Sequence, residues 1–173
     1  PVDNLYALPA LADHVRSLHL PNLVVVSPDA GFVKAARRYA AYLGASLAIA
    51  NKERPDHSEQ AEVLEIIGDV AGKTALIVDD FTISGGTLAE VARRVIDAGA
   101  VEVYAMVTHG VLTPSAIANI ESSPLKKLFF TDTVETQPVK LSPKMQVVSV
   151  ASIFAEAIRR IHTHESISGM FPG

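Results

Sequence analysis

The sequence predicts an α/β protein with a mostly parallel sheet and helices on both faces. Short apolar runs rich in β-branched residues alternate with amphipathic stretches from one end of the chain to the other. Turns containing glycine or proline separate them. No internal repeat, low-complexity segment or linker divides the 173 residues, so residues 1–173 should form a single domain.

The first predicted strand is Leu23–Ser27, and Phe32–Leu43 has the apolar spacing of a helix, with Gly44 as its C-terminal cap. A short strand at Ser46–Ala50 should lead into a polar surface loop, Asn51–Gln60. The other predicted elements are strand Glu62–Ile67, strand Thr74–Val78, helix Thr87–Ala98, strand Val101–Val107, helix Ser115–Ile120, strand Lys127–Phe130, loop Thr136–Lys144, strand Gln146–Val150 and helix Ile153–His162.

Composition narrows the functional classes. A net charge of −4 and a pI near 5.8 argue against a general nucleic-acid binder. No apolar run reaches the ~20 residues that span a bilayer, so no membrane association is expected. The chain has no cysteine, which suits a reducing, cytoplasmic location.

The segment ALIVDDFTISGGTL at residues 75–88 is the most informative. Two carboxylates, Asp79 and Asp80, follow a buried strand, and a small turn, Ser84–Thr87, then opens a helix. Backbone N–H groups at such a corner bind anions, whereas the carboxylates can accept hydrogen bonds from a diol or hold a cation. Anion and diol together describe a sugar phosphate. The alternative is an ordinary α/β turn with a solvated pair of aspartates.

Other polar segments also follow predicted strands, where ligands of parallel sheets collect. Asp29 is either the cap of the following helix or a bridge to a diphosphate through Mg²⁺. Lys52 and Arg54 either lie on a solvated surface or bind phosphoryl oxygens as a pair of cations. For His109, a structural hydrogen-bonding role is favoured over a catalytic one. The run Thr131–Thr133 either reaches the same crevice or starts a loop.

Near the C-terminus, His162, His164 and Glu165 resemble a metal cluster in composition only. Their position at a helix end favours a solvated or interface role.

Several segments together resemble one family, ribose-phosphate pyrophosphokinase, and in particular its carboxyl-terminal half. Across nearly the whole chain they are PVDNLYA at 1–7, SPDAG at 27–31, KER at 52–54, GDV at 68–70, VDD at 78–80, THGV at 108–111, TDT at 131–133, AEAIRRIH at 155–162 and the ESIS tail with Phe171. The GGT turn at 85–87 is also similar to that of type I phosphoribosyltransferases. The resemblance implies a phosphoribosyltransferase-like fold and the conversion of ATP and ribose 5-phosphate, with Mg²⁺, to phosphoribosyl pyrophosphate and AMP.

The resemblance also implies roles. Lys52 and Arg54 would be catalytic cations that stabilise the transferred diphosphoryl group, with Arg54 also near the ribose 5-phosphate. Asp79 and Asp80 would hold the ribose hydroxyls. Ile83, Ser84, Gly85, Gly86 and Thr87 would hold the 5′-phosphate. Asp29, Ala30, Gly31 and Phe32 would bind the diphosphate, with Asp29 as the metal ligand. Homo-oligomers are also implied.

The chain departs from the family pattern at two positions. Ile83 stands where many members have an acidic residue, and Phe32 stands where a second glycine is frequent. The chain also matches only half of the family's length, so we expect this polypeptide alone to bind ribose phosphates but to have little synthetase activity.

Two alternatives stay open. One is a stand-alone phosphoribosyltransferase that uses phosphoribosyl pyrophosphate. The other is a non-catalytic regulatory subunit associated with a synthetase.

Overall fold

A computed structural model describes residues 2–53, 63–135 and 141–171. Its strands are β1 (Leu23–Ser27), β2 (Ser46–Glu53), β3 (Val63–Ile67), β4 (Thr74–Thr82), β5 (Glu102–Gly110), β6 (Leu125–Thr131) and β7 (Met145–Val148). Its helices are α1 (Leu8–Ser17), α2 (Val33–Leu43), α3 (Gly86–Asp97), α4 (Pro114–Ser122), α5 (Ala151–His162) and the 3₁₀ helix η1 (Ser168–Met170).

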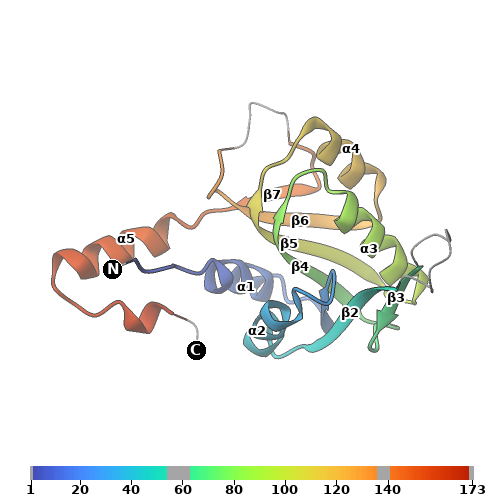
Figure 1. Ribbon diagram of the computed structural model, residues 1–173, viewed down its shortest axis with the longest axis horizontal. Coiled ribbons are helices and arrows are strands. Elements are labelled where there is room, and N and C mark those ends of the chain that lie inside the picture. Colours follow the sequence, from blue (N-terminus) through green and yellow to red (C-terminus); the bar gives the residue numbers. More distant parts are fainter. Residues whose placement is uncertain (1, 54–62, 136–140, 172–173) are drawn as a thin grey trace.

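The strands form one seven-stranded sheet in the order β3-β2-β1-β4-β5-β6-β7 (Figure 1). All neighbours are parallel except β2 and β3, which pair antiparallel. The predicted fold class, a mostly parallel sheet, is therefore confirmed. Because β4 lies at the centre and the order reverses beside it, its carboxyl end opens at the place where ligands bind in such folds.

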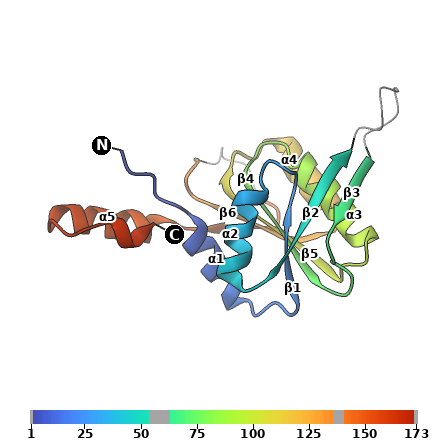
Figure 2. The same ribbon diagram turned by 60° about the horizontal axis from the view of Figure 1, so that its bottom comes forward.

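Helices cover both faces of the sheet, as predicted (Figure 2). On one face α3 and α4 pack on a core that contains Leu88, Ile120 and Phe130. On the other face α1 and α2 pack on a core that contains Leu11, Leu76 and Phe129. Alternate residues of β4 enter the two cores, which explains why this strand reads as a continuous apolar run.

Several strands extend further than the sequence predicted. β4 continues through Asp79 and Asp80 to Thr82, and β5 continues through His109, because Phe81 pairs with His109 at their shared end. β2 runs to Glu53, so the start of the predicted polar loop is strand instead. Residues 51–53 are part of the strand because they pair with residues 63–65 of β3. The rest of that loop lies outside the described residues, as do residues 136–140 of the other predicted loop.

Helix α1 was not predicted. Its buried residues Leu8, Leu11, Ala12 and Val15 follow the helical spacing, and Pro9 lies in its first turn. The sequence signal for it was therefore present. The helix ends just before His19, whose φ of 51° is left-handed.

Helix α5 extends away from the body of the molecule (Figure 1). Ala157 is its only buried residue. Phe154, Ile158 and Ile161 lie on one stripe of the helix and are 51%, 66% and 63% exposed. No helix in the described ranges is long and apolar enough to cross a membrane.

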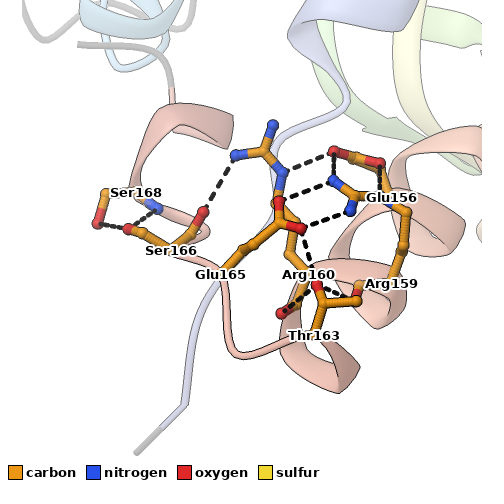
Figure 3. Close-up of polar contacts among 7 residues, drawn as sticks. All are labelled: Glu156, Arg159, Arg160, Thr163, Glu165, Ser166 and Ser168. Atoms are coloured by element: carbon orange, nitrogen blue, oxygen red, sulfur yellow. Dashed lines mark hydrogen bonds and ion pairs between the residues drawn. The ribbon is translucent and has the colours of Figure 1, made fainter.

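Ion pairs tie the C-terminal segment back to α5 (Figure 3). Arg159 donates to Glu156 and Glu165, and Arg160 donates to Glu156 and to the carbonyl oxygen of Ser166. Hydrogen bonds from Arg159 and then Arg160 lower the pKa of Glu156 to about 2. Glu165 is thus engaged by an arginine. These side chains are exposed or half-buried, so we expect the network to orient the tail more than to stabilise the fold.

We expect Gly110→Ala to lower the free energy of unfolding by about 1–3 kcal/mol, the usual cost of overpacking a core. A Cβ at Gly110 would lie 2.6 Å from Cδ2 and 2.9 Å from Cγ of the fully buried ring of Phe130. Urea unfolding measures the change. Gly169→Ala is the control, because its Cβ would meet nothing closer than 3.8 Å. Equal stability of the two variants would contradict this account.

Candidate functional site

A cavity of about 540 Å³ opens at the carboxyl end of β4, between the β1–α2 turn and the start of α3. Its lining residues are Asp29, Gly31, Phe32, Asp79, Asp80, Phe81, Thr82, Ile83, Ser84, Gly85, Gly86, Thr87 and Leu88. The predicted diphosphate turn, acidic pair and phosphate turn therefore meet at one place. Ala30 is the one residue of these segments that does not line the cavity.

The phosphate turn has the backbone that an anion site needs. Gly85 is the residue before α3 and has a φ of 68°, which favours glycine. A Cβ there would also lie 3.2 Å from the side chain of Ile120. The first turn of α3 contains no acidic residue, so the positive end of the helix dipole faces the cavity without a competing carboxylate of its own.

Side-chain oxygens occupy two N–H groups of this turn. Thr82 Oγ1 accepts a hydrogen bond from the N–H of Gly85 at 3.2 Å, and Ser84 Oγ accepts one from the N–H of Gly86 at 3.3 Å. The N–H groups of Ile83 and Ser84 have no partner within the described residues. Ile83 and Ser84 both line the cavity, so the turn has two backbone donors there that are unpaired within the described residues.

The two carboxylates of the acidic pair differ in environment. Asp79 is partly buried and Asp80 is exposed, and each accepts the N–H of the next residue, at 2.9 and 2.8 Å. Burial is the main reason that the pKa of Asp79 rises to about 7, and the negative charges of Asp80 and Asp29 add to it. The described residues that line the site therefore carry negative charge that no described cationic side chain among them neutralises.

Asp29 caps the turn that precedes α2 rather than the helix itself, whose N-cap residue is Phe32 and which has no side-chain cap. Its Oδ1 accepts the N–H of Phe32 at 2.9 Å, at the entrance to α2. It also lies close enough to Asp79 to raise the pKa of that carboxyl. Capping this turn is compatible with the other predicted role, because one carboxylate oxygen caps the turn while the side chain lines the cavity.

Carboxylate oxygens and unneutralised negative charge suit a hard cation such as Mg²⁺, which typically uses one or two protein carboxylates. Within the described ranges no group of three acidic, histidine or cysteine side chains has the arrangement of a metal cage. The donor set fits a cation that is shared with a bound phosphate better than a cation held by protein alone.

A second cavity, of about 530 Å³, adjoins the first, and Phe32 and Asp80 line both. Aromatic rings of Tyr6, Tyr39 and Phe154 contribute to its walls. The sequence did not single out these three rings, because they come from the N-terminal segment, α2 and α5, which only the fold brings together.

His109 and Thr133 also line the second cavity. His109 Nδ1 is 2.7 Å from Thr133 Oγ1, which lies 2.8 Å from Thr131 Oγ1. This agrees with the structural hydrogen-bonding role predicted for His109. Asp132 does not line either cavity; it accepts hydrogen bonds from Ser149 Oγ and the N–H of Val150 and so fixes the start of α5.

The predicted catalytic cations are only partly described. The backbone of Lys52 lies near the carboxyl end of β2, and its side chain lies outside the described part of the chain. Since β2, β1 and β4 are parallel, that end of β2 lies at the same edge of the sheet as the acidic pair. Arg54 falls outside the described residues.

The fold is similar to that of phosphoribosyltransferases. The structure superposes on adenine phosphoribosyltransferase from Thermoanaerobacter pseudethanolicus with a TM-score of 0.57 over 72% of this chain and 77% of the other, at 18% identity. At that identity the likeness concerns the fold alone.

The particular family follows from closer matches. The model of the phosphoribosyl synthetase-associated domain matches residues 51–172, so the chain belongs to this family. The chain is 48% identical to ribose-phosphate pyrophosphokinase of Caldanaerobacter subterraneus subsp. tengcongensis over 99% of its own length and 54% of that protein's. The corresponding enzyme of Rhizobium meliloti is 44% identical, with 99% and 56% covered.

Among solved structures, phosphoribosylpyrophosphate synthetase from Mycobacterium smegmatis matches with a TM-score of 0.85 and 31% identity, over 95% of this chain and 53% of that one. The resemblance seen in the sequence is confirmed. The chain spans about half the length of the curated relatives it matches.

We expect the wild-type protein to lose stability relative to Asp79→Asn as the pH rises from about 4 to 7. The folded state holds the Asp79 proton more tightly than the unfolded state, whose pKa is near 3.8, so raising the pH through this window favours unfolding. Above about pH 7 the difference should level off. Urea unfolding at a series of pH values measures this difference in stability. The matched control is Asp97→Asn, at the end of α3 away from the site. Parallel curves for wild type and Asp79→Asn would contradict the raised pKa.

Proposed function

We propose that this chain binds ribose 5-phosphate in the cavity at the end of β4, as part of a ribose-phosphate pyrophosphokinase. The observation that carries the proposal is the meeting of the acidic pair and the phosphate turn in one cavity. Asp79 and Asp80 then accept hydrogen bonds from the ribose hydroxyls. Ile83, Ser84, Gly85, Gly86 and Thr87 hold the 5′-phosphate through backbone donors and hydroxyl groups.

In the proposed reaction, O1 of ribose 5-phosphate attacks the β-phosphorus of ATP in line. The new O1–Pβ bond forms as the bond between Pβ and the bridging oxygen of the α-phosphate breaks. AMP leaves, the O1 proton is released and phosphoribosyl pyrophosphate forms. Positioning and charge stabilisation account for most catalysis in such transfers.

The remaining residues carry the diphosphoryl side. Asp29, Gly31 and Phe32 line the same cavity as the phosphate turn, and the turn Asp29–Phe32 would face the transferred group. Mg²⁺, which Asp29 would help to hold, supplies charge neutralisation on the phosphoryl oxygens. Lys52 and Arg54 are the proposed cations for the transition state. We propose that ATP binds as the second substrate and that the full activity belongs to a longer protein that contains this chain.

A stand-alone phosphoribosyltransferase is the second candidate, and the second cavity favours it. This cavity begins at Asp80, beside the proposed ribose position, and its aromatic walls could accept a planar base. A screen of nucleobases for pyrophosphate release from phosphoribosyl pyrophosphate separates the two functions. Release of AMP from ATP and ribose 5-phosphate without base-dependent release supports the synthetase.

Self-association is also proposed, through the apolar stripe of α5. Its three exposed residues are Phe154, Ile158 and Ile161. Sedimentation of the chain tests this directly: Ile158→Ser should shift the protein toward the monomer if this stripe is the contact.

We expect the double substitution Asp79→Asn with Asp80→Asn to weaken ribose 5-phosphate binding by about 2 kcal/mol or more. Hydrogen bonds to charged groups typically contribute 1.5–3 kcal/mol each. Calorimetry measures the affinity, with Asp97→Asn as the control. A folded wild-type chain that binds no ribose 5-phosphate would favour the non-catalytic subunit instead.

We expect Lys52→Ala to leave ribose 5-phosphate affinity near that of wild type and to lower turnover by about 10²–10³-fold in a protein that contains both halves. The loss follows because a removed charge-stabilising donor costs the transition state more than the ground state. AMP release measures turnover. Lys73→Ala, at the opposite end of β4, is the control. Equal loss of binding and turnover would contradict a role confined to catalysis.

A further inference from the structure

The segment that follows β5 holds three consecutive carbonyl groups of the phosphate turn. The N–H of Val111 donates to the carbonyl oxygen of Thr82 at 3.0 Å. Thr113 donates to that of Ile83 through its N–H at 3.1 Å and its Oγ1 at 3.0 Å. One helical turn into α4, Asn119 Nδ2 donates to that of Ser84 at 2.8 Å.

These contacts fix which way the N–H groups of the turn point. In a trans peptide the C=O and N–H groups point in opposite directions. Holding these three carbonyls toward residues 111–119 therefore directs the N–H groups of Ile83, Ser84 and Gly85 away from that segment, and the N–H of Gly85 meets Thr82 Oγ1. The cavity lies along this turn, and Ile83 and Ser84 have no other partner for their N–H groups in the described ranges.

The backbone between the two donors adopts an unfavourable conformation, which indicates that packing holds it in place. Leu112, which lies between the two donors Val111 and Thr113, has a φ of 36°, a conformation that a leucine rarely adopts. Its side chain is only 1% exposed, within the core shared by α3 and α4. Packing of Leu112 therefore holds the bend that allows both neighbouring N–H groups to reach the turn.

The orientation of the peptide groups matters more for anion binding here than it would in a site lined by cationic side chains. None of the described residues that line the cavity is lysine, arginine or histidine. Three of them are aspartates, so the overall charge of the lining opposes an anion. An anion bound by the turn consequently depends on aligned backbone dipoles and hydroxyl groups.

We propose that Thr113 and Asn119 are positioning residues for the phosphate of the ligand. They do not touch the phosphate; they act by holding the peptide groups that do. The inference rests on the proposed function, because it names the residues that prepare the same site. It extends the candidate site from the segments around β1, β2 and β4 to α4.

The test compares wild type with Thr113→Val, Asn119→Leu and the double variant, titrated with ribose 5-phosphate and, separately, with inorganic phosphate. We expect roughly tenfold weaker binding of both ligands in each single variant, by calorimetry, and a larger loss in the double variant. In amide NMR spectra, the ligand-induced shift of the Ser84 N–H, which has no partner in the described ranges, should shrink in the variants. If Thr113 and Asn119 served stability alone, binding would weaken only together with a lower unfolding temperature. We expect weaker binding at an unchanged unfolding temperature.

Two further variants keep the test decisive if the double variant does not fold. Thr113→Ser retains the hydroxyl group and should restore wild-type affinity. Glu121→Gln, on the exposed end of α4, should bind as wild type does.

The two proposals fail differently. If wild type binds ribose 5-phosphate and the Thr113 and Asn119 variants bind it equally well, the positioning role is wrong and the proposed function stands. If Thr113→Ser binds as weakly as Thr113→Val, the role of the Thr113 hydroxyl is wrong. If the folded wild type binds neither ligand, the proposed function and the positioning role are both overturned.

Discussion

The pairing of β4 with β5 beyond the buried core is the interaction on which the candidate site depends. Up to Val78 the strand is held by packing on both faces, but Asp79 to Thr82 are polar or exposed and gain little from burial. The ladder with β5, which continues to Thr82 and Gly110, keeps this part extended. The acidic pair therefore projects from a rigid strand, and the phosphate turn starts at a fixed point.

The site combines two electrostatic demands that oppose each other. The turn and the start of α3 favour an anion, while three aspartates nearby disfavour one. Part of this conflict is visible in Asp79, whose pKa is raised to about 7 by burial and by its acidic neighbours. A ligand that brings hydroxyl groups to the acids and a phosphate to the turn satisfies both sides, and a cation shared with a second phosphoryl group would relieve the remaining charge.

Much of this organisation could be predicted from the sequence, because it is encoded locally. The apolar run before Asp79, the glycines at 85 and 86 and the polar turn at Asp29 each follow a strand within a few residues. In a parallel sheet this suffices to bring them to one edge. The apolar spacing of α1 is also encoded locally, so this helix could have been predicted in the same way.

What could not be predicted depends on contacts between distant segments. The final residues of β2 look like a polar loop, and only pairing with β3 makes them a strand. Asn119 is unremarkable within α4 until the fold places its amide 2.8 Å from the carbonyl oxygen of Ser84. Likewise, His109 of β5, Thr131 of β6 and Thr133 just after β6 form a hydrogen-bonded chain that no spacing in the sequence predicts.

The structure also changes how the two departures from the family pattern are understood. Phe32 has a φ of −88°, so its backbone does not require glycine, and its ring lines both cavities at their junction. Ile83 is 48% exposed, while its carbonyl group is held by Thr113. A side chain can vary at such a position without disturbing the peptide groups, since these are oriented from α4. The two substitutions therefore alter the surface that a ligand meets and leave the backbone of the site intact.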